Sequence, residues 1–155
     1  MGSVAGGGGR TLAGVADAFG LQRFVDAQED GGSYDAAVRE LTSGRKVSHW
    51  MWYVFPQVAG LGRTPTAQYY AVSGLAEARA YLAHPVLGPR LRECARILTS
   101  LPGSDPVAVL GPVDALKLRS SMTLFALADP DEPVFHEVLD QYYGGVPDEA
   151  TTSRV

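Results

Sequence analysis

Residues 44–62, GRKVSHWMWYVFPQVAGLG, combine side chains that hold a ligand by charge, by stacking and by hydrogen bonding. Lys46 is suited to a phosphate or carboxylate, and the imidazole of His49 exchanges protons near neutral pH. Trp50 and Trp52 offer flat surfaces to a planar ligand. Each residue type also has a structural interpretation, because aromatic clusters usually form core and a lone histidine is commonly a hydrogen-bonded core group.

A second polar group interrupts the apolar stretch 113–128. Asp114, Lys117 and Ser121 are spaced i, i+3 and i+7, which places them on one side of a helix. Charges on a buried helix must be paired or must face a cavity. We therefore weigh two arrangements: an Asp114–Lys117 ion pair that satisfies itself, or a pocket shared with the aromatic segment.

The chemistry that these two segments suggest is acid–base chemistry on an anionic, partly planar ligand. The candidate catalytic residues are His49, Lys117 and Asp114, and the candidate ligand contacts are Lys46, Trp50, Trp52, Gln57, Ser121 and Thr123. No pair of histidines has the H-x-x-x-H spacing, and a single cysteine, Cys94, excludes a multi-cysteine site, so we expect no metal. Gly60-Leu61-Gly62 lacks the preceding strand of a dinucleotide-binding loop, and we expect no cofactor.

Composition limits the classes of protein further. A chain of 155 residues with 46% hydrophobic and 19% charged residues has the size and composition of one globular domain. A net charge of −4 and a pI near 5.3 argue against nucleic-acid binding. No apolar run reaches the ~18 residues of a membrane span, and no signal peptide is evident, so we expect a cytoplasmic protein. The sequence gives no indication of oligomeric state.

Hydrophobic periodicity predicts an all-α domain of about seven or eight helices. Leu21, Phe24, Val25 and Gln28 follow helical spacing, and the same pattern recurs through the chain to a final helix at about 131–143. The nearly all-apolar stretch 113–128 predicts a central helix. We expect a flexible Gly/Ala-rich extension at 1–20, the helical domain at 21–148 and a tail at 149–155.

Four strings carry a family resemblance: LQRFVDAQ at 21–28, the segment at 44–62, YLAHPVLGPRL at 81–91 and DALKLRSSMTLF at 114–125. Over about residues 20 to 148 the chain resembles the bacterial domain-of-unknown-function family 1810, sometimes labelled calpastatin-like. The resemblance implies a predominantly helical single domain and no established activity. A calpastatin-like inhibitor would be a long disordered repeat, which this composition contradicts.

Two functions are consistent with these observations. The first is a cofactor-independent enzyme, such as a metal-independent hydrolase, whose partner is a nucleotide-like or NAD-like small molecule. The second is a non-catalytic binding or protein-interaction module. The second predicts a buried, hydrogen-bonded His49, an Asp114–Lys117 pair, and no adjoining cavity of roughly 300 Å³.

Overall fold

The computed structural model describes residues 17–155, and all of the regular secondary structure in this range is helical. In addition, a single isolated parallel β-bridge pairs Val58 with Val72. The helices are α2 (Gln22–Glu29), the short 3₁₀ helix η1 (Asp30–Gly32), α3 (Ser33–Thr42), α4 (Met51–Val54), α5 (Pro65–Tyr69), α6 (Leu75–Ala83), α7 (Leu87–Ser100), α8 (Pro106–Leu110), α9 (Pro112–Ala128), α10 (Pro133–Tyr143) and α11 (Glu149–Thr152). The expected all-α single domain is confirmed.

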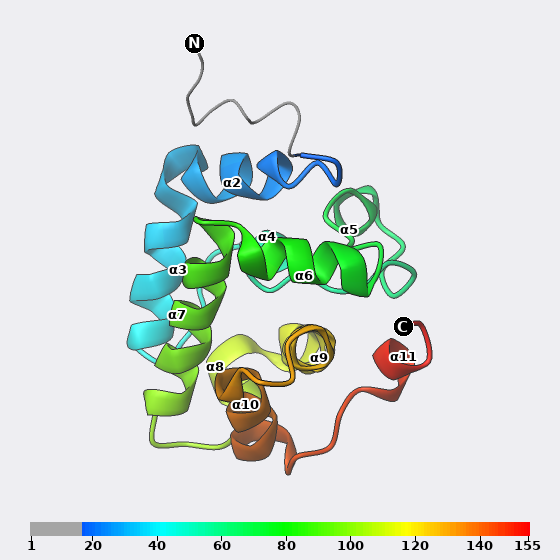
Figure 1. The fold of residues 1–155 in the computed structure, drawn as a ribbon. Helices are drawn as coiled ribbons and strands as arrows, with labels where there is room; N and C mark the ends of the chain where they lie inside the picture. The colour runs from blue at the N-terminus through cyan, green and yellow to red at the C-terminus, as the bar shows by residue number, and fades with distance from the viewer. Residues whose placement is uncertain (1–16) are drawn as a thin grey trace.

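Helix α9 is central, as its composition predicts. Pro112 occupies its first position, where the missing N–H costs no intrahelical hydrogen bond. Its side chains are buried on several sides, including Leu118, Met122 and Phe125. Figure 1 shows α9 below α6 and beside α10, with α11 packed against it from the right. The rest of the domain is therefore assembled around α9.

The N-terminal half forms a wall beside this centre. Helices α3 and α7 stand side by side at the left of Figure 1, and α2 lies across their upper end. The buried side chains of Phe24, Ala37 and Leu91 contribute to one hydrophobic core with the α9 residues. The candidate segment, residues 44–62, begins in the loop between α3 and α4, and its Lys46 forms an ion pair with Asp114 of α9.

Local capping signals set several helix ends. The side chains of Thr64, Asp105, Glu132 and Asp148 accept hydrogen bonds from backbone N–H groups in the first turns of α5, α8, α10 and α11. Such caps satisfy donors that have no partner within the helix. Proline follows three of these four caps, which fixes the entry into the helix.

The boundaries of the domain differ from those expected. Most of the extension expected at 1–20 lies outside the described residues, but Asp17 belongs to the fold because its carboxylate accepts the N–H groups of Leu21 and Gln22. The tail expected at 149–155 contains α11, which packs on α9. Tertiary contact orders this short segment, which has no long apolar pattern of its own.

Within residues 17–155, no helix is both long and apolar enough to cross a lipid bilayer.

Candidate functional site

Glu40, near the end of α3, anchors the beginning of the candidate segment. Its carboxylate accepts the N–H of Val47 at 2.8 Å, the N–H of Ser48 at 2.9 Å and the indole Nε1–H of Trp50 at 2.9 Å, and it also accepts the Ser48 hydroxyl. Burial alone would raise the pKa of Glu40, but the hydrogen bonds from Ser48, Val47 and Trp50 outweigh burial and lower it to about 2. Glu40 is therefore an anion that fixes the path of residues 46–50.

This anchoring brings Lys46 onto α9. The ammonium of Lys46 lies 2.8 Å from one carboxylate oxygen of Asp114, and that of Lys117 lies 3.7 Å from the other. A separation of 3.7 Å is too long for a hydrogen bond. The closer partner of Asp114 is thus Lys46, from another part of the chain, and the expected Asp114–Lys117 contact is the looser one.

The two lysines around one carboxylate leave one net positive charge. The side chain of Lys46 is only 7% exposed and is held by Asp114, whereas that of Lys117 is 23% exposed. Lys117 donates no hydrogen bond to any other residue in the described part of the chain. Its three N–H donors are therefore available to an anion.

The two tryptophans have different roles. Trp50 is fully buried, and its Nε1–H is bound to Glu40, so it is core and no stacking surface, contrary to its expected ligand contact. Trp52 is half-buried, and the Lys117 ammonium lies 4.7 Å from its ring centroid. At this distance the cation is attracted to the face of the ring. Trp52 is thus the half-exposed aromatic side chain at Lys117, whereas the Lys46 ammonium lies 5.2 Å from the ring centroid of the buried Trp50.

A cavity of about 530 Å³ adjoins Lys46. It is lined by Arg45, Lys46, the α8 residues 107–110 and Gly111. Its volume falls in the range of small-molecule sites, about 300 to 1,000 Å³. Its walls combine two cationic side chains with apolar ones, which suits an anion that carries an apolar part. No residue of this α8 wall is among the ligand contacts expected from the sequence.

Polar residues farther along α9 divide into two groups. Thr123 is buried, donates to the Arg119 carbonyl at 2.8 Å and accepts the N–H of Asp148 at 2.9 Å. It therefore fixes the chain just before α11. It was expected among the ligand contacts, but its hydrogen bonds do not connect it with the lysines. Ser121 is also fully buried, but its hydroxyl has no hydrogen-bond partner among the described residues.

His49 and Gln57 do not join the lysine cluster, which consists of Lys46, Lys117, Asp114 and Trp52. His49 is exposed, and its imidazole makes no hydrogen bond or ion pair with the described residues; only its carbonyl accepts, from the Tyr53 hydroxyl at 3.3 Å. It is neither the buried histidine of the binding-module alternative nor an oriented base. The carbonyl of Gln57 accepts the N–H of Val72 at 2.8 Å, and its side chain makes no hydrogen bond to the lysines or to Asp114. These two residues lie in the right segment but outside the site.

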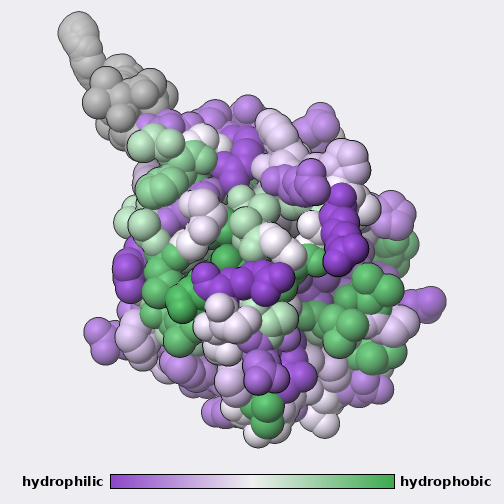
Figure 2. Space-filling view, turned by 90° about the vertical axis from the view of Figure 1, so that its right-hand side faces the viewer, coloured by the Kyte–Doolittle hydropathy of each residue, from purple (hydrophilic) through white to green (hydrophobic). Residues whose placement is uncertain are grey.

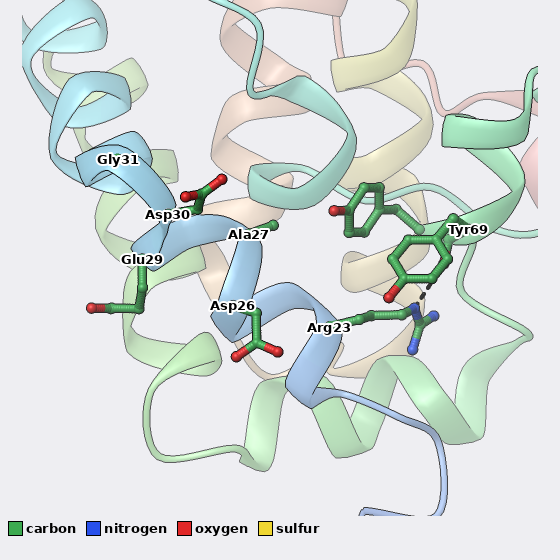
Figure 3. A pocket seen from close by; sticks show the side chains of 8 residues that line it. Arg23, Asp26, Ala27, Glu29, Asp30, Gly31 and Tyr69 are labelled. Carbon is green, nitrogen blue, oxygen red and sulfur yellow. Dashed lines mark hydrogen bonds between the residues drawn. The ribbon is translucent and has the colours of Figure 1, made fainter.

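A larger cavity, of about 640 Å³, lies between α2 and α5. Figure 3 shows that the carboxylates of Asp26 and Glu29 on α2 and of Asp30 on η1 point in different directions, so they do not converge on a ligand. All five N–H donors of Arg23 are used within the protein, on four backbone carbonyls and Glu77. Arg23 is a structural clamp, and we therefore favour the lysine cluster despite its smaller cavity.

Cys94 and metal ligands add no further site. Cys94 is buried, and burial raises the pKa of its thiol to about 12, so it is protonated at neutral pH. Among residues 17–155, no three histidine, cysteine, aspartate or glutamate side chains group as metal ligands.

Comparison with known proteins identifies relatives of unknown activity. The profile of the family described as protein of unknown function (DUF1810) matches residues 18–155. The crystal structure of a conserved hypothetical protein from Mycobacterium tuberculosis is 49% identical in sequence and superposes with a TM-score of 0.85, covering 88% of this chain and 96% of that one. No curated protein matches.

Proposed function

The chain belongs to the DUF1810 family of proteins of unknown function, and from the geometry of the lysine cluster we propose that it binds a small anionic ligand with a planar part. The observation that carries the proposal is the Lys117 ammonium, which lies on the Trp52 ring and 3.7 Å from its nearest carboxylate oxygen. It retains both its charge and its hydrogen-bond donors for a ligand.

The roles of the other residues follow from their contacts. Asp114 keeps Lys46 and Lys117 together, because each ammonium approaches a different oxygen of the same carboxylate. The adjoining cavity gives room for the rest of the ligand, with Arg45 at its wall. A phosphate or carboxylate gains charge-assisted hydrogen bonds there, and a planar group packs on the half-exposed Trp52.

The proposal is limited to binding. An acid–base catalyst is normally held in place by a hydrogen-bonded partner, and the exposed imidazole of His49 makes no such bond within the described residues. The geometry thus supports the expected class of ligand, while the hydrolytic reaction considered from the sequence gains no support from His49.

Calorimetric titration with three related compounds tests the proposal. AMP carries both an anion and a planar ring, ribose 5-phosphate lacks the ring, and adenosine lacks the anion. We expect AMP to bind most tightly, and Lys117→Gln to weaken its binding about tenfold or more, as for loss of a charge-assisted hydrogen bond. Arg96→Gln is the matched control, because it removes one positive charge from an exposed position on α7.

If AMP and ribose 5-phosphate fail to bind at millimolar concentration, or if Lys117→Gln binds AMP as the wild type does, the lysine cluster is a structural ion-pair network.

The alternative, an interaction module, is favoured by a separate observation. Val47, Val113 and Leu116 are 74%, 65% and 67% exposed. Where large apolar side chains gather at a surface, they often mark an interface. Apolar residues also gather in two areas of the face in Figure 2, where charged side chains separate them. If these three exposed side chains pair two copies of the chain, sedimentation shows a concentration-dependent dimer that Leu116→Glu abolishes. A monomer at all concentrations rules out that pairing.

A further inference from the structure

The first two turns of α9 carry an apolar face that no other helix covers. Val113 and Leu116 are both exposed, and their spacing of three residues makes them neighbours on the helix surface. The Nε–H of Arg119 donates to the Val146 carbonyl at 2.9 Å, which places the exposed Val146 beside the same helix. Large apolar side chains that gather at a surface in this way often mark an interface.

Positive charges border this α9 face on both sides. With 3.6 residues per turn, Val113 and Leu116 lie between Arg119 on one side and Lys117 on the other. The chain as a whole has a net charge of −4, so this basic border differs in sign from the average surface. Charge complementarity therefore calls for a partner surface with an apolar centre and acidic edges.

The groove between α2 and α5, with its cavity of about 640 Å³, has an aromatic wall. Tyr69 is 60% exposed, and its ring meets that of Tyr70 edge-on, with the ring centroids 4.8 Å apart. A tyrosine ring attracts both apolar side chains and cations. The wall thus offers a docking surface that the protein leaves open.

The edges of the same groove are acidic. Glu29 is paired with Arg90, whereas Asp26 and Asp30 are exposed and form no ion pair within the described residues. Arg23, which also lines the groove, is neutralised by its ion pair with Glu77. The carboxylates point in different directions in Figure 3. This arrangement does not suit one small ion, but it lets each carboxylate meet a separate cation on a protein surface.

We propose that the α9 face of one copy of the chain docks in the α2–α5 groove of a second copy. Val113 and Leu116 then pack on the ring of Tyr69, and the cations that border them face the two free carboxylates. Figure 1 shows α2 across the upper end of the molecule and α8, which leads into α9, in its lower half. One copy therefore offers both surfaces at once, and the contact is of the head-to-tail kind that forms rings or open chains.

Charge distinguishes this contact from a two-fold pairing of the α9 face with itself. A two-fold axis through Leu116 would bring the Lys117 and Arg119 side chains of both copies together, and like charges across an interface oppose association. The groove has no part in such a pairing. Its carboxylates therefore provide the means to tell the two contacts apart.

Sedimentation velocity with two variants of the full chain tests the proposal. Leu116→Glu alters the face, and Asp26→Lys with Asp30→Lys alters the groove. We expect wild type to assemble as its concentration rises, less so in about 500 mM than in about 50 mM salt, and each variant alone to associate about tenfold more weakly or worse. An equal mixture of the two variants should form a dimer and stop there, because it contains one intact face and one intact groove.

Asp131→Lys with Glu137→Lys is the matched control, because it makes the same change of charge at exposed positions outside both surfaces. It should assemble as wild type does, and circular dichroism checks that every variant keeps its helices. A wild type that stays monomeric at millimolar concentration overturns the proposal, as does a mixture of the two variants that stays monomeric. A groove variant that assembles like the control overturns it in favour of two-fold pairing. None of the mutated residues belongs to the lysine cluster, so these results do not depend on whether the small anion binds.

Discussion

The anchoring of residues 46–50 by Glu40 gives the sharpest test of how the candidate site is built. Replacing Glu40 by alanine removes the acceptor of the Val47 and Ser48 N–H groups and of the Trp50 indole. The difference between an ordinary pKa of 4.5 and a pKa of about 2 corresponds to about 3.4 kcal/mol, at 1.36 kcal/mol per pH unit. Glu40 is only half-buried, so solvent screening reduces this value, and we expect a loss of about 1 to 2 kcal/mol.

The sign of the pH dependence follows from the lowered pKa. A carboxyl group whose pKa is lower in the folded state stabilises the fold above its unfolded pKa, and this contribution disappears as the pH falls through the folded value. The contribution of Glu40 is therefore complete above about pH 4.5 and is lost between 4.5 and about 2. The difference in stability between wild type and Glu40→Ala should shrink over that interval.

Thermal unfolding followed by circular dichroism measures both effects. At pH 7 we expect Glu40→Ala to lower the melting temperature by about 2 to 8 °C, given about 2 to 4 °C per kcal/mol for a chain of this size. Glu137→Ala, which removes an exposed carboxylate from α10, is the control for net charge. A Glu40 variant that melts like this control at pH 7, or whose deficit is the same at pH 3, refutes the anchoring role.

Two further predictions concern the scaffold. Gly88→Ala should lower stability by about 1 to 3 kcal/mol or more, because the new Cβ would lie 2.1 Å from the Leu82 carbonyl oxygen where α6 meets α7; Gly103→Ala, which meets nothing within 4 Å, should not, and equal melting temperatures would contradict the contact. The Nδ1 of His84 accepts the N–H groups of Val86 and Leu87, where α7 begins, and burial lowers the pKa of the imidazole from 6.5. Protonation then favours the unfolded chain, so wild type should lose stability as the pH falls below about 6.5, and a His84→Asn variant with the same pH profile would contradict this.

The helices could be predicted from the sequence because their signals are local. Apolar spacing placed the helix at 113–128 to within one residue of the observed α9, where Pro112 occupies the first position, as Pro65 does in α5. Helical spacing also put Asp114, Lys117 and Ser121 on one face, since that relation depends only on the number of residues per turn. A segment such as α11 escaped prediction because it is ordered by contact with α9.

Which candidate residues meet was decided by tertiary structure. Lys46 pairs with Asp114 through space, and no spacing in the sequence connects them. Trp50 and Trp52 look equivalent in the chain, but Glu40 holds one in the core and leaves the other on Lys117. In the sequence Glu40 was an ordinary charge near a helix end. The residue types and the helical face follow from the sequence by itself, whereas pairing, burial and the missing partner of Ser121 depend on how distant segments pack.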